Sequence, residues 1–168
     1  MAEDAFWYEA AFVVGVTNAL NVVADGLPAG ALPAAEDTDA AGGALLDDIA
    51  AFYGGVVPAP FRVLAWDRAY AADLFAATKR AFTDRRLSRR LKESLAFAVS
   101  LTTRSPFGTA MHLAEMRRLG VGPRGVMEVV GVTQMFSSYT KIADTLQLES
   151  DMHDIAPVDT SGVPEGAT

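Results

Sequence analysis

Residues 87–101 read LSRRLKESLAFAVSL and residues 105–119 read SPFGTAMHLAEMRRL, and these two stretches decide the fold. Ser88 is a typical N-cap for a helix that runs from residue 89 to about residue 103. From residue 94 to residue 101 this helix is apolar nearly all round, which is typical of a central helix covered on several sides. Ser105 followed by Pro106 is typical of the start of the next helix, and Gly120 ends that helix. The sequence therefore predicts two consecutive helices at the centre of the molecule.

Helical periodicity continues on both sides of this centre. Upstream, helices are predicted at residues 6–24, at residues 44–53 and, after the N-cap Asp67, at residues up to 82. Downstream, Gly122-Pro123 opens a long helix that reaches about residue 146. The apolar stripe of the first helix is predicted to contain Phe12, Val16, Ala19, Leu20, Val23 and Leu27. No segment alternates as a strand would, so we expect an all-α bundle of about six or seven helices.

The 168 residues suit one domain with additional segments at its ends. We expect an N-terminal helix within residues 1–27 and a flexible loop at residues 28–43, which are rich in proline, glycine and acidic residues. The main helical domain is expected at residues 44–148. Residues 149–168 are expected to form a poorly ordered tail.

The charge balance restricts the partners. A net charge of −7 and a pI near 4.7 argue against nucleic acid and against an anionic membrane, since both attract clustered Lys and Arg. With no leader-like segment recognised, a cytoplasmic protein is expected. One local basic cluster is either a solvated helix entrance or an anion or oligomer contact. It consists of Arg85, Arg86, Arg89, Arg90 and Lys92.

The chain contains no cysteine, which excludes disulfides, thiolate metal sites and cysteine nucleophiles. Its two histidines, His112 and His153, are too far apart in sequence to indicate a metal ligand set. The glycines at residues 42–43 and 54–55 fit loops better than a phosphate-binding turn. We therefore expect neither a metal nor a cofactor.

One sequence pattern occurs twice. Residues 13–18 read VVGVTN and residues 129–134 read VVGVTQ, and both helices finish with Ala-Asp-x-Leu. Two helices with equivalent packing roles would explain the echo, as would chance similarity between two valine-rich helices.

Glu93 and His112 are the acid–base candidates, because both lie near apolar helix faces. Each also has a plainer explanation. Glu93 could be an exposed carboxylate favoured by the helix dipole and by Arg89 and Arg90 one turn back. His112 could be a packed side chain bonded to a carbonyl.

The order Glu93, Ser105-Pro-Phe-Gly108, His112 resembles the frame of the alkylhydroperoxidase D-like, or carboxymuconolactone decarboxylase-like, superfamily, in its peroxidase-related branch. That family carries a glutamate, then a Cys-x-x-Cys pair twelve residues on, then a histidine four residues after the second cysteine. In this chain Ser105 and Gly108 stand at the two cysteine positions. The resemblance covers about residues 52–148 and includes VPAPFRVLAWD at residues 57–67.

The resemblance implies a helical bundle that commonly assembles as a homo-oligomer. Thiol peroxidase activity is excluded, because neither Ser105 nor Gly108 can run a sulfur redox cycle. Ser105 lies about 10.5 Å along the helix from His112, too far for direct activation, and fits an N-cap better than a nucleophile.

Two functions remain open. One is a cofactor-free lyase or isomerase that acts on a small carboxylated metabolite with Glu93 and His112, beside a small gap at Gly108. The other is a non-catalytic helical oligomer that binds a small ligand or a protein.

Overall fold

The computed structural model describes residues 4–27 and 40–149, and within them it contains helices and no strand. The all-α prediction is therefore confirmed. The seven helices are α1 (Asp4–Gly26), α2 (Ala40–Phe52), α3 (Ala59–Leu64), α4 (Arg68–Phe82), α5 (Arg89–Thr102), α6 (Pro106–Arg118) and α7 (Pro123–Leu146). Residues 150–168 of the predicted tail and most of the predicted loop lie outside the described residues, and α2 begins inside the range given to that loop.

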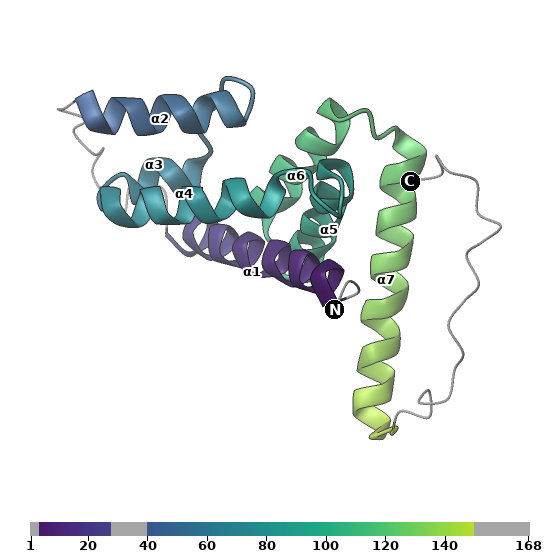
Figure 1. Ribbon diagram of the computed structural model, residues 1–168. Coiled ribbons are helices and arrows are strands. Elements are labelled where there is room, and N and C mark those ends of the chain that lie inside the picture. The colour runs from purple at the N-terminus through teal and green to yellow at the C-terminus, as the bar shows by residue number, and fades with distance from the viewer. Residues whose placement is uncertain (1–3, 28–39, 150–168) are drawn as a thin grey trace.

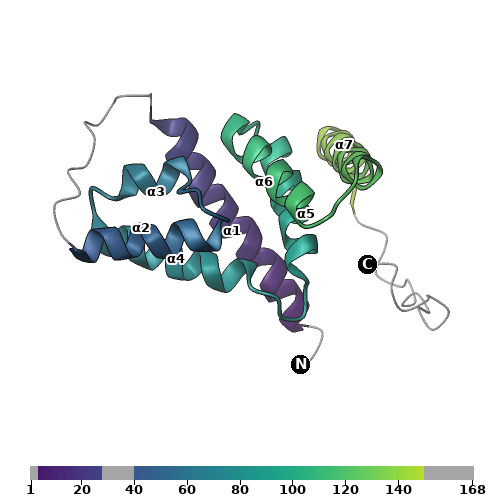
Figure 2. The ribbon, with the colours of Figure 1, turned by 90° about the horizontal axis from the view of Figure 1, so that it is seen from above.

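Helix α5 is the centre of the bundle, as its apolar sequence predicts. It contacts α6 and α1 most extensively, and also α4 and α7. Figure 1 shows α1 as a long rod beneath α4, and Figure 2 shows α2, α3 and α4 on one side of α1 with α5 and α6 on the other. Helix α7 stands beyond α5, at the edge of the molecule (Figure 2).

The predicted helix starts are confirmed by their capping bonds. The side chains of Asp67, Ser88 and Ser105 accept hydrogen bonds from backbone N–H groups three residues on, at 3.0, 3.3 and 2.9 Å. Gly120, with φ at +82°, follows α6 in the left-handed conformation that suits glycine. The short helix α3 was not predicted, although Pro60 in its first turn is compatible with a helix start.

The buried face of α1 includes Val16 and Leu20, as predicted, but is rotated away from Phe12 and Leu27. Val13, Val16 and Leu20 are buried, but so are the polar Thr17 and Asn21, while Phe12 is 38% exposed. The predicted stripe contained apolar residues only and so left out Thr17 and Asn21. Within the described residues α1 is the one helix long and apolar enough, by length and composition, to span a membrane. Of its apolar 18-residue window, 28% is buried by the rest of the described chain.

The start of α1 is tied to the turn between α4 and α5 by Glu9. Its carboxylate accepts hydrogen bonds from the backbone N–H groups of Arg86 and Leu87 at 3.2 and 3.1 Å. Lys92 is fully buried and places Nζ 3.0 Å from Glu9 and 2.6 Å from the carbonyl of Thr83. Partial burial opposes ionisation of Glu9, but these N–H donors outweigh it and hold the pKa of Glu9 below its ordinary value.

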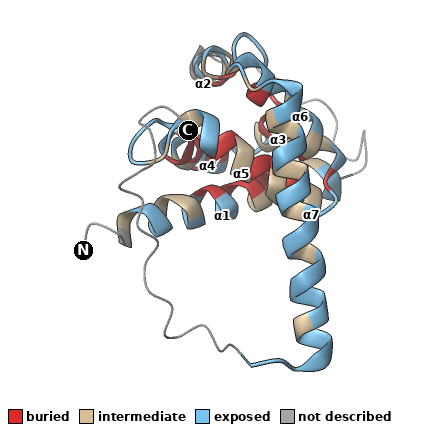
Figure 3. Ribbon diagram, turned by 90° about the vertical axis from the view of Figure 1, so that its right-hand side faces the viewer, coloured by how far each residue is buried: buried red, intermediate tan, exposed pale blue. Residues whose placement is uncertain are grey.

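Helix α7 is almost entirely exposed to solvent. None of its residues is buried, and Figure 3 shows most of its length as exposed surface. Several large apolar side chains on it are more than half exposed, namely Met127, Val132, Met135, Phe136, Tyr139, Ile142 and Leu146.

Candidate functional site

Glu93 and His112 meet between α5 and α6. Nδ1 of His112 lies 2.8 Å from Oε2 of Glu93, and both side chains are 1% exposed. The sequence-based proposition that the two groups meet across neighbouring helices therefore agrees with the structure. The plainer explanation of Glu93 as an exposed carboxylate is wrong.

A chain of ion pairs continues from this contact towards the surface. Arg89 donates from Nε to Glu93 at 2.8 Å and from Nη2 to Glu115 at 3.2 Å. Glu115 also accepts two hydrogen bonds from Arg118, at 2.9 and 2.6 Å. The guanidinium of Arg89 lies 4.3 Å from the ring centroid of Phe52, over its face. These contacts offset the cost of burying the carboxylates.

The ion-pair network corrects the interpretation of the basic cluster. Arg89 has a 13% exposed side chain and Lys92 is fully buried, so neither belongs to a solvated helix entrance. Both are interior cations held by carboxylates. Arg89 and Glu115 were not predicted as part of the site, although Glu115 follows His112 by three residues and so lies on the same side of α6.

Two buried polar atoms beside this network have no hydrogen-bond partner in the described residues. They are Nε2 of His112 and the hydroxyl of Tyr53. Burial, together with the carboxylate of Glu93, raises the pKa of Tyr53, so this phenol stays protonated. When Nδ1 of His112 carries its proton towards Glu93, Nε2 is left as a proton acceptor. The ring of Phe82 stacks on His112 with centroids 5.8 Å apart, which holds the imidazole in place.

The predicted gap beside Gly108 does not exist. A Cβ atom at residue 108 would collide with Oδ1 of Asn21 and with Oγ of Ser100, and would lie 2.9 Å from Cγ of Asn21. Those two side chains are themselves joined by a 3.1 Å hydrogen bond. Ser105 is buried and caps α6 through the N–H of Gly108, as predicted. Of the two cysteine positions of the family frame, Ser105 therefore acts as the N-cap of α6, and Gly108 allows α6 to pack closely against α1 and α5.

No group of three or more His, Cys, Asp or Glu side chains within residues 4–27 and 40–149 is placed to hold a metal ion. His153 lies outside these residues.

The model of the carboxymuconolactone decarboxylase family matches residues 62–148. This region is just over half of the chain and includes Glu93, Ser105, Gly108 and His112. The chain belongs to the carboxymuconolactone decarboxylase family. No curated protein and no solved structure matches it.

Membership of the carboxymuconolactone decarboxylase family agrees with the resemblance drawn from the order of Glu93 and His112. Since the chain has no cysteine, this member does not carry out thiol peroxidase chemistry. The family region begins at residue 62, within α3, and omits α1 and α2.

Proposed function

We propose that this protein works as a non-catalytic helical homo-oligomer, in which α7 provides the main contact surface between subunits. The observation that carries the proposal is the exposure of α7. A 24-residue helix with no buried residue loses much of its stability unless an apolar partner covers it. The net charge of −7 favours a protein partner over nucleic acid.

The repeated sequence pattern supports a second copy as that partner. In α1 the pattern lies in the core, where Val16 is 6% exposed and Leu20 is 1% exposed. The equivalent positions in α7 are Val132, which is 58% exposed, and Phe136, which is 63% exposed. The valine at the fourth position of the pattern is thus covered in α1 and exposed in α7. Contact with α7 of another subunit would give the second copy the environment that the first already has.

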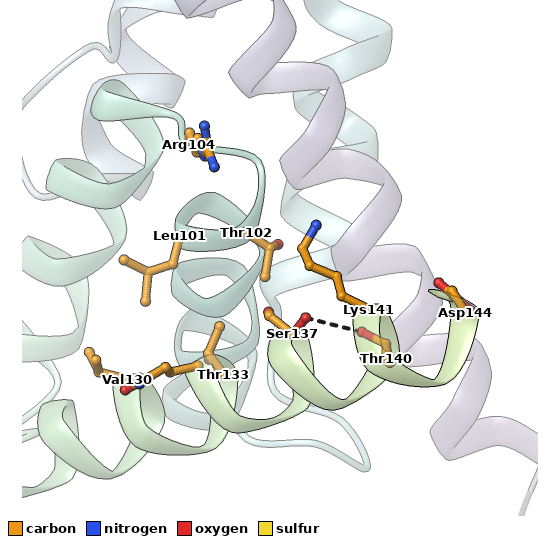
Figure 4. A pocket seen from close by; sticks show the side chains of 10 residues that line it. Leu101, Thr102, Arg104, Val130, Thr133, Ser137, Thr140, Lys141 and Asp144 are labelled. Carbon is orange, nitrogen blue, oxygen red and sulfur yellow. Dashed lines mark hydrogen bonds between the residues drawn. The ribbon is translucent and has the colours of Figure 1, made fainter. Parts of the chain in front are cut away.

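A groove beside α7 offers additional contact surface. It has a volume of about 640 Å³ and lies between the end of α5 and α7. Figure 4 shows Ser137, Thr140 and Lys141 on α7 facing Thr102 at the end of α5, with Arg104 at the far side. This lining mixes hydroxyl groups and charges, which is typical of the polar rim around an apolar contact.

Light scattering coupled to size-exclusion chromatography tests the proposal. We expect a mass that is a multiple of 17.8 kDa. Val132→Lys and Phe136→Lys should shift the mass towards that of one chain, because each places a charge in the contact. Val22→Lys is the matched control, since Val22 is 71% exposed on α1. A wild-type protein that remains at 17.8 kDa at every concentration would exclude this function.

A second candidate, acid–base catalysis in a lyase or isomerase, is favoured by one observation. Nε2 of His112 is buried and unpartnered, while Nδ1 is fixed by Glu93. We rank it second because neither side chain lines the groove at α7, the pocket at Tyr53 or the pocket at Arg80. Screening lactones, keto acids and enols provides the test. If His112→Ala and Glu93→Gln leave every turnover unchanged, this candidate is excluded.

A further inference from the structure

We propose that a pocket between α6 and the turn that joins α2 to α3 binds a small amphipathic monocarboxylate, with an apolar body and a single carboxylate. This inference does not depend on the proposed self-association. The pocket has a volume of about 420 Å³, within the range typical of small-molecule sites. It is lined by the face of α6 that carries Phe107, Met111 and Ala114, next to the face that carries Gly108 and His112.

The walls favour an apolar ligand body. Val57 and Pro58 form one side of the pocket, and Phe107 and Met111 form the other. A flexible methionine adapts to ligands of different shape. These side chains bind carbon chains or rings by burial of apolar surface rather than by hydrogen bonds.

A guanidinium at the rim supplies an anion contact. Arg62 lines the pocket, and its Nη1 donates a 3.0 Å hydrogen bond to the carbonyl of Val57. That bond fixes the side chain beside the opening. Because a guanidinium has five N–H donors, Arg62 keeps enough of them to bind both oxygens of a carboxylate.

The wall also contains a buried donor without a partner. Tyr53 lines the pocket, is 8% exposed, and its hydroxyl has no hydrogen-bond partner in the described residues. An unpaired buried hydroxyl is costly, so a ligand oxygen that accepts its proton gains more than it would from a solvated phenol. The Tyr53 hydroxyl is thus a donor beside the pocket that a ligand oxygen reaches once neighbouring side chains move aside.

The local charges favour one negative charge on the ligand. Two charged side chains line the pocket, the cation Arg62 and the carboxylate Glu115. Glu115 is paired with Arg89 and Arg118, so its charge is compensated within the protein. Arg62 therefore supplies one positive charge to a ligand, which matches a monocarboxylate and disfavours cations.

The test uses hexanoate as the probe and hexanamide as its neutral analogue, in NMR spectra of protein labelled with ¹³C at the methionine methyl groups. We expect the Met111 methyl signal to shift saturably with hexanoate. The Met127 and Met135 methyl groups serve as internal controls, because both are exposed on α7 and no residue of α7 lines the pocket. The signal of Met116, which is fully buried, reports whether each variant is folded.

Three variants make the test specific. Arg62→Gln should weaken hexanoate binding by roughly fivefold, the effect of one charged contact at a solvent-accessible rim. Ala114→Phe should abolish the Met111 shift, since Ala114 is exposed and lines the pocket. Tyr53→Phe should weaken binding without lowering the stability of the ligand-free protein, because the hydroxyl that it removes has no partner.

Several outcomes would overturn the proposal. They are a Met111 shift that does not saturate, equal binding of hexanamide, or full binding by folded Ala114→Phe protein. Each would mean that the pocket is only packing space.

Discussion

Replacing Gly108 by alanine should destabilise the protein, although alanine is the better helix former. In an open helix the change gains up to about 1 kcal/mol. Here the new methyl group would collide with Asn21 and Ser100, and such overpacking costs about 1–3 kcal/mol. Separating the buried Asn21–Ser100 hydrogen bond costs a further 1–3 kcal/mol or so. We expect a net loss of about 3 kcal/mol.

Urea unfolding followed by far-ultraviolet circular dichroism measures this loss. With a slope near 2 kcal/mol per molar urea, roughly typical of a protein of this size, the midpoint should fall by about 1.5 M. All variants must be compared at one protein concentration, since self-association adds to stability. Gly15→Ala is the matched control, because residue 15 lies inside α1 with no atom within 4 Å of the added carbon, and it should raise the midpoint slightly. If Gly108→Ala behaves like Gly15→Ala, the close packing at Gly108 is wrong.

Three more predictions concern the ion pairs and the caps. Glu93→Gln should lower the free energy of unfolding by about 3 kcal/mol, because it leaves the buried Arg89 with one fewer carboxylate. Urea unfolding measures the change. Glu128→Gln is the control: it breaks an exposed ion pair with Arg124 and should change the stability very little. The lowered pKa of Glu9 stabilises the fold above the ordinary glutamate pKa of 4.5, and this stability is lost as the pH falls through the lower folded value. The difference in stability between wild type and Glu9→Gln should therefore shrink below pH 4.5 in a pH series of thermal melts, and a constant difference would contradict the Glu9 contacts. Ser105→Ala should cost about 1 kcal/mol through loss of the α6 cap, and a cost far above that found for Ser88→Ala would point to a role beyond capping.

Local features of this chain were predictable from sequence, and long-range contacts were not. Asp67, Ser88 and Ser105 each bond to a backbone group three residues away, so the sequence around them contains both partners. The Asn21–Ser100 bond joins residues that are 79 positions apart, and nothing near either residue indicates the other. These two side chains fill the space at Gly108, which explains why the predicted gap is absent and why the predicted stripe of α1 left out Asn21.

The contact between Glu93 and His112 was predictable for another reason. It rested on the order of residues shared with a known family rather than on periodicity. That order contains no information about Arg89 and Glu115, which extend the contact into a network. Sequence reasoning thus found two members of the site and missed Arg89 and Glu115, the next two members of the network.

The position of α1 has a practical consequence for anyone who expresses part of this protein. A clone that began where family similarity begins, at residue 62, would lack Val13, Leu20 and Asn21, and with them one wall of the interior. It would also leave the buried ammonium group of Lys92 without the carboxylate of Glu9. The unit that folds is therefore larger than the family region, and it extends to the N-terminal helix α1.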